Sequence, residues 1–216
     1  MKLTFLGSGD AFGSGGRFNT CFHVTTSDGT FLIDCGATSL VAMRHFKVDP
    51  NAIGTIFLTH LHGDHFGGLP FFILDAQLVS RRATPLTIAG PPGVAQRFRD
   101  LMEVMFPGMS KIQQRFPIDY VEVSPGAEKK VGSVTVTPFL AAHNSGAPSL
   151  TLRLACENRV LVYSGDTGWT EALVTQSRGA DLFICECCFY ETKVDFHIDY
   201  PRLAAERHRL DCKRLV

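Results

Sequence analysis

Side chains that commonly bind metal ions crowd the segment THLHGDHFGG, positions 59–68. The set is His60, His62, Asp64 and His65. They follow the apolar run GTIFLT, which is typical of a buried strand. A loop at the end of a strand can aim such groups at one point, whereas a helix sends residues two apart to different faces. Imidazoles with a carboxylate suit Zn²⁺, and after it Mn²⁺ or Fe, so the segment predicts a metal site in a loop rather than a helical HExxH-type site.

Three further candidates are distant in sequence but share one kind of position, the end of an expected strand. His143 follows TPFLA, Asp166 follows RVLVYSG, and His197 lies in a loop after DLFICECCFYE. A lone histidine at a strand end is most often an ordinary surface or core residue. The shared placement makes these three residues candidates for the same site.

The elements that must position these residues are strands in both halves of the chain. Apolar or alternating runs broken by Gly, Asp and Ser predict LTFLG, CFHVTT, TFLIDCG, GTIFLTH and PLTIAG in the first half. VTVTPFLA, SLTLRLAC, RVLVYSGDT and DLFICECCF follow in the second. Asp28-Gly29 is a strong hairpin signal between two of the early strands. The run ending at Asp34 and the run ending at Asp166 are each followed by a helix and a strand, which indicates two repeated halves.

Helices are expected at about 38–46, from Leu69 to about Val79, after GPPG (90–93) and over TEALVTQ. Asp199 is positioned to cap a last helix that begins with Pro201 and runs to about Leu210. Two β-rich halves with covering helices predict an α/β protein with two packed sheets and helices outside. Because no linker or low-complexity segment separates the halves, residues 1–216 are expected to form a single domain.

Composition narrows the functional class. The 216 residues are 45% hydrophobic and 19% charged, which is typical of a globular protein. The net charge is zero, so the sequence lacks the basic footprint of a dedicated nucleic-acid binder. No apolar run approaches the roughly 18 residues that span a bilayer, and the N-terminus lacks a signal-peptide core. A cytoplasmic protein with no membrane partner and seven reduced cysteines is expected.

THLHGDH, together with His143 in AAHNSG and Asp166 in YSGDT, resembles the metallo-β-lactamase superfamily. The finer resemblance is to ribonuclease Z, the tRNA 3′-processing endonuclease. It rests on FLGSGDAFGSGGRFNT, HGDHFGGLP and PLTIAGPPG in the first half, and on SGDTGWTEAL, DLFICECCFYE and His197 in the second. The resemblance covers nearly the whole chain.

The resemblance implies a four-layer αββα sandwich with two divalent metal ions between the sheets, Zn²⁺ first and Mn²⁺ or Fe as alternatives. The implied metal ligands are His60, His62 and His143 for one ion, Asp64 and His65 for the other, and Asp166 bridging both. A bridging water, its pKa lowered from about 15.7 towards about 7, would be the nucleophile.

The resemblance also implies individual roles. Asp64 and His197 belong to the catalytic set, with His197 as the proton donor to the leaving oxygen. Asp34, in LIDCG, is similar to a carboxylate that orients a ligand histidine, although a simple capped strand end explains it equally well.

The sequence departs from ribonuclease Z in two places. That family carries a long tRNA-gripping arm between the segments that hold His143 and Asp166, whereas positions 144–165 are only 22 residues. A further ligand histidine of the family follows one more strand, and CKRLV stands where that strand would begin. We therefore expect a chain that lacks its C-terminal strand and helix, and a substrate other than intact pre-tRNA.

The sequence favours a dinuclear metal-dependent hydrolase of phosphodiesters, acting on RNA ends or on small cyclic or nucleotide esters. A thioester, lactone or β-lactam hydrolase of the same fold is the alternative enzyme. A non-catalytic metal-binding relative is the alternative of a different class. The branch is often dimeric, so the resemblance is also compatible with a homodimer.

Overall fold

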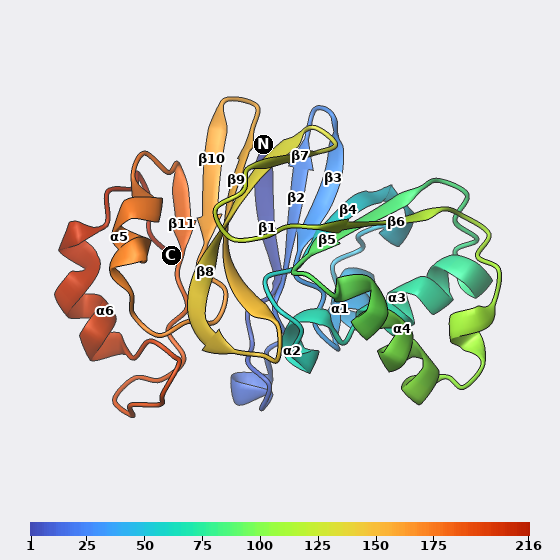
Figure 1. The fold of residues 1–216 in the computed structure, drawn as a ribbon, viewed down its shortest axis with the longest axis horizontal. Helices are drawn as coiled ribbons and strands as arrows, with labels where there is room; N and C mark the ends of the chain where they lie inside the picture. Colours follow the sequence, from blue (N-terminus) through green and yellow to red (C-terminus); the bar gives the residue numbers. More distant parts are fainter. The chain divides into compact units, whose positions relative to one another are not determined.

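The computed structural model describes all residues from Met1 to Val216, which form two compact units, Met1–Glu122 and Val123–Val216. In Figure 1 the first unit runs from blue to yellow-green and the second from yellow to red. The first unit holds a 6-stranded sheet and the second a 5-stranded sheet, each with its own helices. The expectation of two β-rich halves with helices is confirmed.

The sheet of the first unit has its strands in chain order. Their bounds are Lys2–Gly7 (β1), Cys21–Thr26 (β2), Gly29–Ile33 (β3), Ile53–Phe57 (β4), Leu86–Gly90 (β5) and Ile118–Glu122 (β6). β1 to β3 are antiparallel, and β3 to β6 are parallel. The predicted hairpin is confirmed, since Thr26 pairs with Gly29. Because β3 and β4 are parallel neighbours, the residues after both strands meet at the same edge of the sheet.

Helices of the first unit cover this sheet. Their bounds are Ser39–His45 (α1), Gly63–Phe66 (α2), Leu69–Leu74 (α3) and Val94–Met105 (α4), with 3₁₀ turns at Ser14–Gly16, Pro50–Ala52 and Met109–Lys111. α3 continues directly into a π-helical segment, Asp75–Val79, so the helix predicted from Leu69 to Val79 is confirmed. α3 and α4 are in contact in Figure 1. α4 buries Val94, Phe98 and Met102, four residues apart, as an amphipathic helix requires.

The sheet of the second unit has the order β11-β10-β9-β8-β7. Its strands are Lys129–Val131 (β7), Val134–Asn144 (β8), Pro148–Cys156 (β9), Arg159–Tyr163 (β10) and Leu182–Ile184 (β11). All neighbours are antiparallel except β10 and β11. Between His143 and Asp166 the chain forms β9, a tight turn at Glu157 and Asn158, and β10. The segment between the two residues is therefore a short hairpin.

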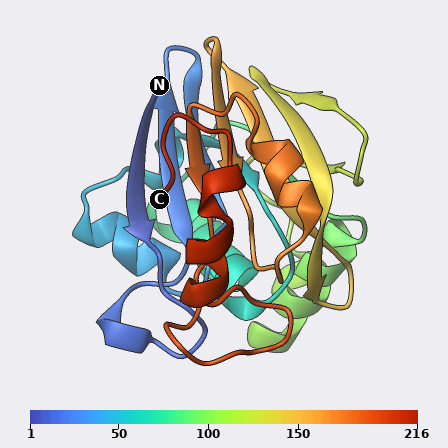
Figure 2. The same ribbon diagram turned by 90° about the vertical axis from the view of Figure 1, so that its left-hand side faces the viewer.

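Two helices pack on β10 and β11, α5 (Glu171–Ser177) and α6 (Tyr200–Glu206), and a 3₁₀ turn at Arg207–Arg209 follows α6. Figure 2 shows both helices on one side of the strands of this unit. Leu173 of α5 is buried with Val162 and Phe183, and Leu203 of α6 packs against the same cluster. The predicted cap of the last helix is confirmed, because Asp199 Oδ1 accepts from Arg202 N at 2.9 Å.

Several predicted boundaries were wrong. The run DLFICECCF is a strand only over Leu182–Ile184, because Glu186 N donates to Ser164 Oγ rather than to a neighbouring strand. β8 extends through His143 instead of ending before it, and the short strands β6 and β7 were not predicted. Val216 N donates to Phe183 O at 2.9 Å, so the CKRLV run pairs with β11. None of the helices combines the length and the apolar composition that spanning a bilayer requires.

Candidate metal and catalytic site

The histidine-rich motif of the first unit gathers at the end of β4. The ring centroids of His60 and His65 lie 4.1 Å apart, and those of His60 and His62 lie 4.9 Å apart. Asp64 Oδ2 is 3.4 Å from His65 Nε2. The prediction of a purely looped motif was wrong in one respect: Asp64 and His65 lie on α2, because His65 N and Phe66 N both bond to the carbonyl of His62 and close a helical turn.

Asp34 supports this motif from the end of β3. It is fully buried and has a left-handed φ of 58°. Its Oδ1 accepts from Thr59 N at 2.8 Å, and its Oδ2 accepts from Thr59 Oγ1 at 2.8 Å and from His65 Nδ1 at 2.7 Å. Burial raises the pKa of the Asp34 carboxyl, and His65 and the Thr59 hydrogen bonds oppose that rise. Asp34 is therefore more than a capped strand end, since it fixes the orientation of the His65 ring.

The segment after β3 also holds α2 through its backbone. Cys35 N donates to His65 O at 2.7 Å, and Gly68 N donates to Cys35 O at 2.8 Å. Gly36 lies so close to α2 that a Cβ atom there would stand 2.0 Å from the carbonyl oxygen of Asp64. Only glycine fits this close approach of two backbones.

Three of the predicted ligand histidines are held by their Nδ1 atoms. His65 Nδ1 donates to Asp34, and His143 Nδ1 donates to the carbonyl of Phe196 at 3.2 Å. Thr59 Oγ1 donates to Asp34 and therefore accepts from His60 Nδ1, at 3.1 Å. Each of these rings then carries its lone pair on Nε2. Metal-binding histidines are anchored in this way, so the donors within each unit fit the chemistry of a divalent metal ion.

The second unit brings together the three distant candidates. One possible ligand atom from each of His143, Asp166 and His197 lies within 4.8 Å of the other two. His143 Nε2 is 4.0 Å from Asp166 Oδ2, and the ring centroids of His143 and His197 are 5.0 Å apart. These three residues thus share one location in this unit, although His143 lies within β8 and His197 lies well beyond the end of β11.

Backbone bonds join the end of β8 to the loop after β10 and so hold this group. Gly168 N donates to Ala142 O at 2.9 Å, and Ala142 N donates to Thr167 Oγ1 at 2.9 Å. His143 and Asp166 each lie next to one of these bonded residues. Their mutual position is therefore set by main-chain contacts rather than by the side chains alone.

Sequence reasoning missed Glu186. Its Oε2 accepts from His197 Nδ1 at 3.1 Å, and its Oε1 accepts from Thr167 N. Burial raises the pKa of the Glu186 carboxyl, and the negative charge of Asp166 raises it further. The hydrogen bond from His197 lowers this pKa and so opposes the rise. The available signal was a single charged residue within the otherwise uncharged run LFICECCFY.

Comparison with known proteins gives curated relatives that are similar over part of their length. The chain is 33% identical over 156 residues to a ribonuclease Z of Methanococcus maripaludis, which is 71% of this chain and 49% of that protein. It is 34% identical over 126 residues to a ribonuclease Z of Exiguobacterium sibiricum, 58% of this chain and 40% of that protein. The chain thus spans about half the length, or less, of these curated relatives.

Solved structures establish the fold. The crystal structure of human tRNase Z, short form, superposes with a TM-score of 0.80 at 25% identity, covering 100% of this chain and 91% of that chain. This likeness confirms the predicted metallo-β-lactamase fold. The family model described as "Anti-Pycsar protein Apyc1" matches residues 1–211, which is nearly the whole sequence. The chain therefore belongs to the Anti-Pycsar protein Apyc1 family, on the ribonuclease Z branch of the metallo-β-lactamase superfamily.

Proposed function

We propose that this protein is a metal-dependent phosphodiesterase. The observation that carries the proposal is the anchoring of His60, His65 and His143 through Nδ1, the arrangement in which metal-binding histidines use Nε2 as the ligand atom. Family membership and the ribonuclease Z relatives support a phosphodiester as the substrate class.

The donors divide into two sets of ligands. His60, His62 and His143 would hold one ion, Asp64 and His65 a second, and Asp166 would bridge them. Imidazole and carboxylate donors favour zinc. When bound, two such ions activate water as the nucleophile and stabilise charge on the oxygens of the phosphodiester.

The protein's own acid–base group would be His197. A protonated His197 can give its Nε2 proton to the leaving oxygen. Its Nδ1 meanwhile donates a hydrogen bond to Glu186 Oε2, 3.1 Å away. The negative carboxylate of Glu186 stabilises the positive imidazolium. Glu186 therefore keeps His197 oriented for proton transfer.

The substrate we propose is a small phosphodiester or an RNA end rather than intact pre-tRNA. The hairpin of β9 and β10 occupies the 22-residue segment where ribonuclease Z has its arm. The net charge of zero adds no general attraction for a polyanion.

The test is hydrolysis of bis-p-nitrophenyl phosphate beside a thioester and a lactone, with metal analysis of the same sample. We expect the phosphodiester to be hydrolysed in preference and zinc to be bound. His197→Ala should lower kcat about 100-fold without loss of metal. His208→Ala is the matched control, since His208 is exposed and bonds only locally to Ala205 O. Preferential hydrolysis of the thioester or lactone, or full activity after chelation, contradicts the proposal.

A further inference from the structure

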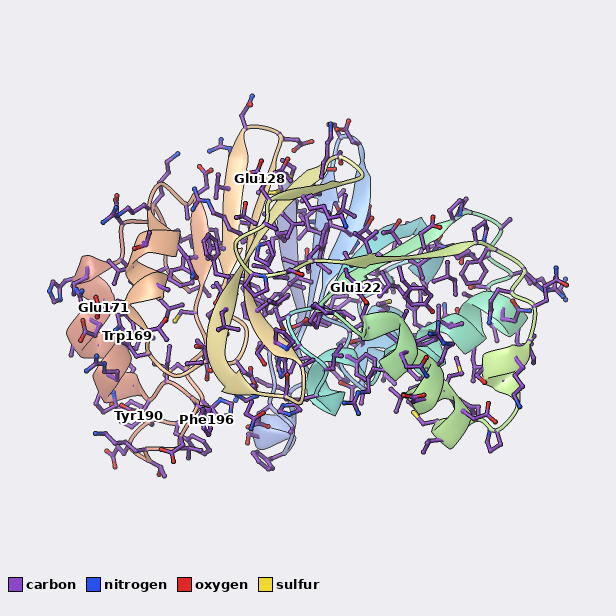
Figure 3. The ribbon with its side chains drawn as sticks, viewed as in Figure 1. Glu122, Glu128, Trp169, Glu171, Tyr190 and Phe196 are labelled. Carbon is purple, nitrogen blue, oxygen red and sulfur yellow. The ribbon has the colours of Figure 1, made fainter.

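A pocket of about 230 Å³ lies in the first unit, between α4, the 3₁₀ turn Met109–Lys111 and β6. None of the residues that we propose as metal ligands lines it. Its apolar walls are formed by Phe98, Met102, Met109, Ile112 and Ile118. Glu122, labelled in Figure 3 at the end of β6, joins this strand to the start of α4, because Gly93 N donates to Glu122 Oε1 at 2.9 Å. The helix and the strand that border the pocket are thus held together by a bond outside it.

The segment that closes the pocket is fixed on both sides of Gln114, which also lines it. Arg115 N donates to Gln77 Oε1 at 2.9 Å, and Gln77 Nε2 donates to Gln113 O at 3.4 Å. Gln77 is buried on the π-helical segment that follows α3. Because these bonds set the backbone around Gln114, the pocket is formed before any ligand enters it.

The Gln114 side chain supplies an acceptor that the protein does not satisfy. Its Oε1 atom is buried and accepts no hydrogen bond. Ser110, another polar residue of the lining, differs in this respect, because its hydroxyl donates to Glu103. A buried acceptor without a partner costs free energy and is rare in folded proteins. The pocket therefore lacks one N–H or O–H donor, which a ligand can provide.

Arg99 and Tyr120 add a positive charge and a neutral donor to the lining. Arg99 is exposed, and its guanidinium donates to the neutral amide of Gln96 at 2.8 Å rather than to a carboxylate. Burial raises the pKa of Tyr120 to about 12, and the nearby charge of Arg99 opposes this rise. The Tyr120 hydroxyl therefore keeps its proton at neutral pH. A guanidinium beside a hydroxyl donor suits a carboxylate.

We propose that this pocket binds a small aromatic carboxylate that carries a ring hydroxyl. Arg99 and Tyr120 would hold the carboxylate, and the ring hydroxyl would donate to Gln114 Oε1. The thioethers of Met102 and Met109 favour contact with an aromatic ring. A cavity of about 150 Å³ holds benzene, so about 230 Å³ has room for one ring with two small substituents. This inference does not depend on the proposed phosphodiesterase function.

The experiment is calorimetric titration of the purified protein with 3-hydroxybenzoate, 4-hydroxybenzoate, benzoate and benzyl alcohol. For a ligand of about ten heavy atoms we expect a Kd below about 1 mM with at least one hydroxybenzoate. Benzoate and benzyl alcohol should each bind about tenfold more weakly, because one lacks the hydroxyl and the other the charge. If neither hydroxybenzoate binds with a Kd below about 1 mM, the inference is overturned.

NMR of the methionine methyl groups locates the bound acid. The signals of Met102 and Met109 should shift on titration, while that of Met43, buried on α1, should not. An acid held elsewhere, for instance by a metal ion, would leave Met102 and Met109 unshifted and would contradict the proposed site.

Gln114→Leu separates a role in binding from a role in folding. It removes the unpaired acceptor at similar volume, so the melting temperature should be unchanged or higher. The tenfold preference for the hydroxybenzoate over benzoate should disappear. A preference that persists in Gln114→Leu shows that this acceptor does not read the hydroxyl, and overturns the inference.

Arg99→Gln tests the charge. It should weaken binding of every carboxylate at least about tenfold and leave benzyl alcohol unaffected. Arg97→Gln is the matched control, since Arg97 lies on the same helix and does not line the pocket. Carboxylate binding by Arg99→Gln that equals the wild type, or an equal loss in Arg97→Gln, rules out the proposed contact.

Discussion

Replacing Asp34 by asparagine tests whether buried hydrogen bonds set which ring nitrogen carries the hydrogen in the histidines that we propose as metal ligands. The asparagine Oδ1 can still accept from Thr59 N, but its NH₂ group replaces the oxygen that accepts from Thr59 Oγ1 and His65 Nδ1. His65 Nδ1 must then accept a hydrogen bond from the asparagine NH₂ group. The hydrogen of the neutral His65 ring therefore moves to Nε2. Thr59 Oγ1, deprived of Asp34, is free to donate to His60 Nδ1, which has the same effect on His60.

This one substitution therefore removes the Nε2 lone pair from two proposed ligands, His65 and His60. Asp34 itself is not among the proposed ligands. Changes at residues that orient ligands typically reduce metal affinity about 10–100-fold, and two histidines are affected, so we expect zinc affinity to fall about 100-fold or more. The metal-free protein should lose only about 1–2 kcal/mol of unfolding free energy, because most bonds are re-formed with reversed polarity.

The assays are zinc competition with a chromophoric chelator and ¹⁵N NMR of the imidazoles, which distinguishes the two tautomers. Asp28→Asn, in the exposed turn before β3, is the control and should behave as wild type. If Asp34→Asn binds zinc as tightly as wild type, or if His65 keeps its hydrogen on Nδ1, the reasoning is refuted.

Three other predictions follow from the site and its surroundings. His60→Ala should lose metal and phosphodiesterase activity together, measured by metal analysis and turnover; activity without metal would contradict this. Hydrogen bonds from Lys213, Val160 N and Arg159 hold the pKa of Asp181 below its ordinary value of 3.8. A carboxyl with a lowered pKa stabilises the fold at pH values above its unfolded pKa and loses that contribution as the pH falls. Asp181→Asn should therefore flatten the decline in melting temperature below about pH 4. An unchanged dependence of melting temperature on pH would count against this prediction. Intact pre-tRNA should be cleaved more slowly than small phosphodiesters, and faster 3′ cleavage in a gel assay would show the opposite.

The local part of the site was predictable because its signal is local. His60, His62, Asp64 and His65 stand within six residues, and a strand before them gives them one location. Hydrophobic periodicity likewise predicted most strands and helices, and Asp199 with Pro201 predicted the capped start of the last helix.

The rest could not be predicted because it depends on contacts between distant segments. Glu186 lies in an apolar run and acquires meaning only through His197, eleven residues further on, and through Thr167 N. β11 ends at Ile184, where the pattern alone continued the strand, because Glu186 N donates to Ser164 Oγ, another contact between distant segments. Asp34 was ambiguous in the sequence for this reason too, since its bond to His65 spans 31 residues.

The close approach at Gly36 makes the site sensitive to a residue with no chemistry of its own. One added methyl group would meet the Asp64 carbonyl at 2.0 Å and would push α2, with Asp64 and His65, away from β3. A homologue with alanine at this position would retain every ligand in its sequence and still be unable to assemble the site. Motif-based surveys that count only histidines and aspartates would classify such a chain as an active enzyme, so Gly36 should be included in the signature that they require.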